Sequence, residues 1–114
     1  MAFQVDVLDD AELLEFFGAE PVARVVEDGY WCYQVSDARG VELRFSFNLY
    51  EASVQTVVSL GNSQIASVSQ EGAERMLLRD GKLRCEFFTS GMKTALTIEI
   101  GGELSIVWSS LRTK

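Results

Sequence analysis

Turn-forming residues recur about every ten positions along most of this 114-residue chain. Glycines stand at positions 29, 40, 61, 72, 81, 91 and 102, and the segment NLYEAS (48–53) fills the one gap in the series. Short antiparallel strands joined by tight turns produce this spacing. The pairs Asp28-Gly29, Asp80-Gly81 and Gly101-Gly102 supply the positive φ angles that tight hairpin turns require. The spacing therefore predicts an antiparallel β-meander of about eight strands.

Between these turns, apolar and polar residues alternate with a period of two. The segment VELRFSFNL (41–49) places every apolar residue on one face and every polar residue on the other, and segments 82–87, 92–100 and 104–108 behave similarly. A sheet with one buried face and one solvated face is typical of antiparallel pairing. The segments share spacing but not sequence, which indicates a meander and not a repeat array.

One short helix is predicted near the N-terminus. Asp9 can cap it, Glu12 completes a capping box, and Gly18 followed by Pro21 ends it. A helix of about eight residues is only about 12 Å long, too small to cover a sheet of eight strands. The sheet must therefore curl into a barrel-like form or fold over as a sandwich, with four helical residues closing an end or an edge: Leu13, Leu14, Phe16 and Phe17.

The predicted fold class is thus α+β, mostly β. The length favours a single domain spanning residues 1–114, with an N-terminal segment and helix over 1–20 and the meander over 21–114.

Negative charge is concentrated at the start of the chain. Residues 1–28 hold eight of the 17 acids and a single base, Arg24, whereas the rest of the chain is balanced and the net charge is −7. A pI near 4.5 argues against binding nucleic acid or an anionic membrane, because both need clustered Lys and Arg. A basic protein is the partner that this charge suits.

The first-turn acids, Asp9, Asp10 and Glu12, complement the helix dipole and need no further explanation. The other acids form either a solvated face or a docking surface. In the strand YWCYQV, Tyr30 points one way and Trp31 and Tyr33 the other, so one set is covered either by the helix and N-terminal segment or by a partner. The candidate partner-binding residues are Asp10, Glu12, Glu15, Glu20, Glu27, Asp28, Tyr30, Trp31 and Tyr33.

The sequence contains no histidine, which excludes Ser-His-Asp and Cys-His nucleophile systems and His-ligated zinc. No cofactor or metal motif occurs, and we expect no enzymatic activity. Cys32 and Cys85 are expected to be core thiols in a reducing compartment and not a disulfide. The N-terminus has no signal-peptide pattern and no window has the length of a membrane span, so a cytoplasmic location is expected.

The segments LRFSFNLYEASVQTVVSLGNSQIASVSQEG (43–72) and IVWSSLR (106–112) resemble the small immunity proteins encoded beside bacterial polymorphic toxins. The resemblance implies a cytoplasmic, single-domain, acidic protein that binds a cognate toxin domain and blocks its active site. Such toxins are frequently nucleases with basic grooves. The families in this group share no common binding residues, so the resemblance assigns none here.

The leading hypothesis is therefore a non-enzymatic module that binds and neutralises a basic toxin domain. One alternative is a barrel-like protein that holds a small apolar ligand, although the large inward residues could simply fill the interior. Another is a subunit that forms a homodimer through an edge strand.

Overall fold

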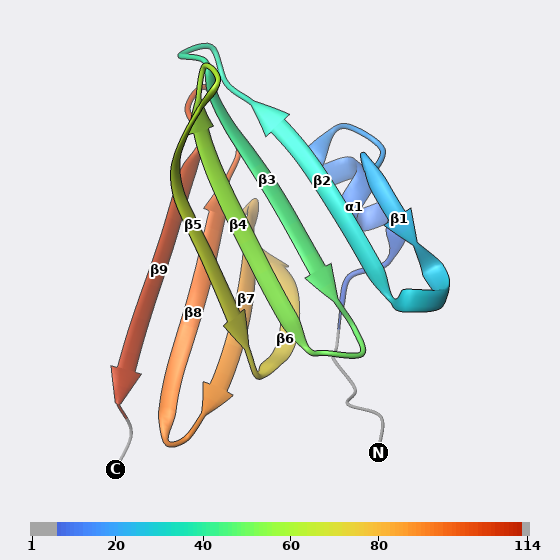
Figure 1. Cartoon of the computed structure of the whole chain (residues 1–114), viewed down its shortest axis with the longest axis vertical. Helices are drawn as coiled ribbons and strands as arrows, with labels where there is room; N and C mark the ends of the chain where they lie inside the picture. Colours follow the sequence, from blue (N-terminus) through green and yellow to red (C-terminus); the bar gives the residue numbers. More distant parts are fainter. Residues whose placement is uncertain (1–6, 113–114) are drawn as a thin grey trace.

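The computed structural model describes residues 7–112, which form one short helix followed by nine antiparallel strands in two sheets (Figure 1). The first sheet contains, in chain order, β1 (Ala23–Val25), β2 (Tyr30–Ser36), β3 (Val41–Asn48), β4 (Ser53–Leu60) and β5 (Ser63–Glu71). The second contains β6 (Ala73–Arg79), β7 (Lys82–Thr89), β8 (Met92–Glu99) and β9 (Ser105–Arg112). The predicted class is confirmed, and the sheet folds over as an open sandwich and does not close into a barrel.

The eight turn signals coincide with the eight connections between these strands. The Asp80-Gly81 turn is confirmed, since its two residues have φ angles of 54° and 74° and join adjacent strands directly. Between β1 and β2 the turn contains a 3-10 helix, η1 (Val26–Asp28), which ends at Gly29.

The prediction of a tight turn at Gly101-Gly102 is wrong, because neither glycine has a positive φ angle and the connection runs from residue 100 to residue 104. This loop is longer because Leu104 is held by the β2–β3 turn before β9 begins.

The N-terminal helix α1 (Asp10–Phe17) begins and ends where the sequence predicts. The Glu12 backbone N–H donates to the Asp9 carboxylate at 2.8 Å, and the Asp9 N–H donates to Glu12 Oε1 at 3.2 Å, which completes the capping box. Gly18 ends the helix with a φ angle of 69°. Leu13 and Phe17 are buried, but Leu14 is 41% exposed, so it does not help to close the sandwich. Leu13 and Phe17 share a face because they are four positions apart, whereas Leu14 lies beside that face.

The inward faces of the two sheets form one apolar core. It includes Leu43, Phe45 and Phe47 of β3 and Leu83, Cys85, Phe87, Leu96 and Ile98 of the second sheet. Trp108 of β9 donates from Nε1 to the buried Thr56 hydroxyl of β4 at 3.0 Å, which links the sheets.

Both cysteines are buried free thiols, and the prediction of a core thiol is confirmed for Cys85. Burial raises the pKa of the Cys85 thiol, which lies in the core. Cys32, in contrast, faces the outer side of the first sheet, where an Arg44 guanidinium nitrogen lies 3.7 Å from its sulfur.

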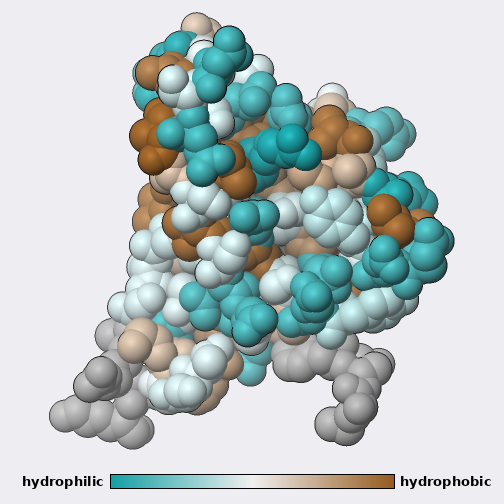
Figure 2. Space-filling model, viewed as in Figure 1, coloured by the Kyte–Doolittle hydropathy of each residue, from teal (hydrophilic) through white to brown (hydrophobic). Residues whose placement is uncertain are grey.

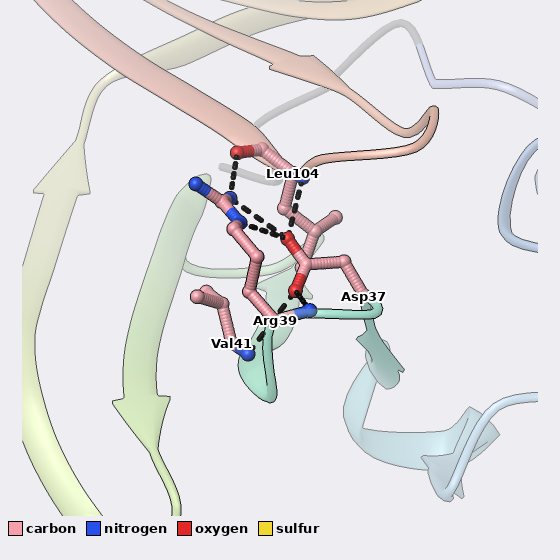
Figure 3. A network of polar contacts seen from close by, with 4 residues as sticks. All are labelled: Asp37, Arg39, Val41 and Leu104. Carbon is pink, nitrogen blue, oxygen red and sulfur yellow. Dashed lines mark hydrogen bonds and ion pairs between the residues drawn. The ribbon is translucent and has the colours of Figure 1, made fainter.

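At one end of the sandwich, the Asp37 carboxylate joins the β2–β3 turn to the loop that precedes β9 (Figure 3). Asp37, in the β2–β3 turn, accepts hydrogen bonds from the backbone N–H groups of Leu104, Arg39 and Val41 at 2.9 to 3.2 Å. The Arg39 guanidinium also donates to Asp37 at 2.7 Å and to the Leu104 carbonyl at 3.1 Å. The Leu104 N–H and then Arg39 lower the pKa of Asp37 to about 2. This Asp37–Leu104 clasp joins positions that are 67 residues apart.

Within residues 7–112, no helix combines the length and apolar character needed to cross a membrane.

Candidate protein-binding surface

The predicted acidic residues are all exposed, but they do not form one cluster. Asp10 lies 3.6 Å from Arg24 of β1, the one base in the acidic segment. Asp10, Arg24 and Glu20 all influence the Tyr33 hydroxyl, whose pKa is raised mainly by burial. These three charges therefore surround the junction between α1 and the edge of the first sheet.

Two other acidic pairs lie elsewhere. Glu12 and Glu15 share a helix face three positions apart and border a hollow with the β6–β7 turn and Ile100. Glu27 and Asp28 belong to η1, at the end of β1. Figure 2 shows hydrophilic side chains gathered along the molecular edge over β1 and η1.

The aromatic residues of β2 divide between the two faces of the sheet, as the alternation predicts. Tyr33 is 2% exposed and stacks on Phe17 of α1 with ring centroids 4.6 Å apart, so the helix covers it. Trp31 also points inward and stacks on Phe47 at 5.6 Å. Tyr30 is the aromatic of this strand that faces outward, which leaves it available to a partner.

A hollow of about 590 Å³ lies on the outer face of the first sheet. Two rows of cross-strand neighbours form its floor and walls: Tyr30, Asn48, Ser53 and Glu71 in one row, and Ser46, Gln55 and Ser69 in the next. Among residues 7–112, the side chains lining it include two carboxylates, those of Glu51 and Glu71, and no cation, although the charge of Arg44 acts on the Tyr30 hydroxyl from outside the lining. We name this surface the polar hollow. It is concave, negatively charged and rich in hydrogen-bonding groups, and Figure 2 shows the face on which it lies.

An exposed aromatic side chain that sequence reasoning missed lies next in the chain to Glu51 of the polar hollow. Tyr50, in the β3–β4 turn, is 62% exposed. Asn48 Oδ1 accepts from the Tyr50 and Glu51 N–H groups at 3.0 Å each, which fixes this turn. The Leu49 N–H donates to the Gly29 carbonyl at 2.8 Å, so the turn lies beside η1 and its acids. The missing glycine in the turn series marked this place, but an exposed tyrosine was not inferred from it.

Burial raises the pKa of the Tyr30 hydroxyl, and the neighbouring Cys32 adds to the effect. The hydroxyl therefore remains protonated at neutral pH and can donate a hydrogen bond into the hollow. Tyrosines at the border between apolar and polar surface are common anchors of protein interfaces.

The outer face of the second sheet is different, because several of its charges are paired. Glu86 accepts from Arg84 at 2.9 Å and lies 3.5 Å from Arg75, and these contacts, led by the Arg84 hydrogen bond, lower the pKa of Glu86. Lys82 lies 4.0 Å from Glu99. Among the described residues, Glu51 and Glu71 of the polar hollow form no such ion pair.

Two findings bear on other kinds of site. An apolar cavity between the sheets, bordered by Phe47, Met76 and Cys85, measures about 10 Å³, which is room for no more than one water molecule. Among residues 7–112, no group of three or more His, Cys, Asp or Glu side chains is placed to hold a metal ion.

The fold and this surface define a small antiparallel β sandwich with a recessed, negatively charged face. No protein-family model and no curated protein matches the sequence. The structure, however, matches one chain of the solved "Contact-dependent growth inhibition toxin - immunity protein complex from Klebsiella pneumoniae 342". The TM-score is 0.88 with 25% sequence identity, and the match covers 97% of this chain and 100% of the other. The resemblance to a toxin–immunity system is therefore confirmed.

Proposed function

We propose that this chain is an immunity protein that binds a cognate toxin domain in the cytoplasm and blocks its activity without catalysis. The observation that carries the proposal is the structural match over the full length of a chain from a toxin–immunity complex. That complex contains two kinds of chain, so the assignment to the immunity side needs support from this chain itself.

Two features favour the immunity side. The chain has no histidine, so the common acid–base and nucleophilic systems that depend on imidazole are absent from it. Its net charge of −7, and a polar hollow whose described lining holds two carboxylates and no cation, are unsuited to a nucleic-acid substrate but suited to covering a positively charged surface.

We infer that the polar hollow and the neighbouring β3–β4 turn form the toxin-docking surface. Glu51 and Glu71 would pair with basic side chains, and Tyr30 and Tyr50 would supply contact area. Glu27 and Asp28 extend the negative charge along the same end of the sheet, and charge of this kind speeds the association with a basic partner.

The function is tested by co-expression with the toxin domain encoded beside this chain. An immunity protein restores growth to cells that make the toxin and co-purifies with it in a one-to-one complex. If growth remains arrested while this chain is made in excess and folded, the proposal is refuted.

The docking surface is tested with two pairs of substitutions that change net charge equally. Glu51→Gln with Glu71→Gln removes the carboxylates of the hollow, and Glu12→Gln with Glu15→Gln removes two exposed carboxylates of the helix. We expect the first pair to weaken toxin binding by roughly 10-fold or more and the second by less than about threefold, since coupling is strong only for close charge pairs. Equal effects would mean that net charge and not the hollow attracts the toxin.

A further inference from the structure

The strand β5 is an edge strand with almost no cover. It is the last strand of the first sheet, nine residues long, and eight of those residues are exposed, including residues on both faces. Ile65 is 60% exposed and Val68 is 37% exposed. An uncovered edge of this kind presents unpaired N–H and C=O groups to any second strand.

The usual protections against edge pairing are largely missing from β5. It contains no Lys, Arg or Pro, and no charged residue occurs between positions 53 and 70. The one protective irregularity is a register shift opposite Val58 and Ser59, near the start of the strand. Of the other three edge strands, β1 is three residues long and β6 carries Glu74, Arg75 and Arg79, whereas β9 has Arg112 as its one charged residue but only three exposed residues among positions 105–110. A long, exposed edge strand whose one charge is at its last residue is a ready template for pairing with another strand.

We propose that β5 pairs with β5 of a second copy of this chain, antiparallel about a two-fold axis at Ser67, which joins two five-stranded sheets into one. In this register Val68 lies opposite Ala66 of the second copy, and both residues point inward in each sheet because they oppose the inward Thr56 and Val58 of β4. Ile65 lies opposite Ser69. Ile65 and Val68 therefore each lie opposite a small side chain of the second copy, which leaves room for them at the interface.

The charge distribution is compatible with this pairing. Glu71, the one charged residue of β5, falls opposite Ser63 and not opposite its own counterpart. The acidic residues of α1 and η1 lie at the other edge of the sheet, beyond β2, β3 and β4. Four strand spacings amount to about 19 Å, which exceeds the Debye length of about 8 Å at physiological salt. Two copies can therefore associate despite their net charge.

The second copy fits the edge better than a basic toxin strand does, because β5 offers no charge complementarity along positions 63–70. Ser69 and Glu71 line the polar hollow, and in this register they lie opposite Ile65 and Ser63 of the second copy, so the second copy borders the hollow along its β5 side.

The experiment measures mass in solution by sedimentation equilibrium, without toxin, at about 5 to 200 µM protein. Wild-type protein is expected at twice the chain mass of 12.7 kDa at the higher concentrations. The variant Ser67→Lys places two lysines opposite each other on the axis and should raise the dimer Kd by roughly fivefold or more. Mixing Ser67→Lys with Ser67→Glu should restore dimers, because the pair across the axis then has opposite charges.

The matched control is Ser109→Lys, an exposed serine on β9, the edge strand of the second sheet. It should dimerise like the wild type. Circular dichroism checks that each variant is folded. A wild-type monomer at 200 µM, a dimer that survives Ser67→Lys unchanged, or a dimer lost in Ser109→Lys would each overturn the proposal. If the wild type is a monomer and Ser67→Lys instead weakens binding to added toxin, then β5 binds the toxin and not a second copy, which also overturns the proposal.

Discussion

Gly72, which carries the chain from the first sheet to the second, should be the glycine least tolerant of substitution. Its φ angle is +84°, and a Cβ built on it would meet Thr89 Oγ1 and the Phe88 carbonyl oxygen, the latter at 3.0 Å. The Phe88 N–H donates to the Gly72 carbonyl at 3.1 Å and the next residue, Ala73, donates to Ala52 at 2.9 Å. These backbone hydrogen bonds hold the crossing in place, so it cannot move away from an added methyl group.

Two costs add up in Gly72→Ala. A left-handed backbone conformation costs an L-residue about 1–2 kcal/mol, and forcing a methyl group into packed atoms costs about 1–3 kcal/mol. We therefore expect the free energy of unfolding to fall by about 2–5 kcal/mol, a large share of the 5–15 kcal/mol typical of a domain.

Two control substitutions separate these costs. Gly61 has a φ angle of +62° with nothing near its missing Cβ, so Gly61→Ala should lose only about 1–2 kcal/mol. Gly101 has neither a positive φ angle nor a close neighbour, so Gly101→Ala should leave stability unchanged or raise it by up to about 1 kcal/mol. Urea unfolding followed by circular dichroism measures all three. If the loss in free energy of unfolding for Gly72→Ala is within about 0.5 kcal/mol of the loss for Gly61→Ala, the steric argument fails.

Three further predictions concern hydrogen bonds. Because the pKa of Asp37 is lowered to about 2 from 3.8, its ionised form stabilises the fold. Asp37→Asn should therefore lower the urea midpoint of unfolding at neutral pH. The difference in midpoint between wild type and variant should shrink as pH falls from about 4 towards 2, and a difference that is independent of pH contradicts this. Trp108→Phe leaves the buried Thr56 hydroxyl without its donor and should cost about 1–3 kcal/mol, part of which Thr56→Val restores in urea titrations of the double variant. Asp9→Ala removes the helix cap and should cost about 0.5–2 kcal/mol by thermal melting, whereas a loss below 0.2 kcal/mol would mean that packing of Phe17 alone fixes the helix.

Local signals in the sequence predicted most of the strands, because turn residues and alternation act over a few positions. A turn residue does not specify whether the turn joins two strands of one sheet or carries the chain to the other sheet. Gly81 closes a hairpin, whereas Gly72 begins a crossing between sheets, and both are glycines at the expected spacing. The difference depends on contacts with Phe88 and Thr89, which lie far along the chain.

The candidate surface was harder to predict for the same reason. Alternation separated Tyr30 from Trp31 and Tyr33 correctly, but only the packing of Phe17 on Tyr33 identifies which side is covered. Glu51 and Glu71 are distant in sequence from the acidic N-terminal segment, and they meet at the polar hollow because β4 and β5 are paired. The distribution of charge along the sequence does not predict that Glu51 and Glu71 lie close together.

The order of strands in the two sheets has a consequence for synthesis on the ribosome. All of the first sheet is encoded before any of the second, so β1 to β5 leave the ribosome before β6 to β9 do. During the following 2 to 8 s, roughly the time needed to make residues 73–112, Phe45 and Phe47 have no facing sheet. We expect the nascent protein to be most prone to aggregation in this interval. Slowing elongation across residues 73–112 should then lower the yield of folded protein while leaving the stability of the finished protein unchanged.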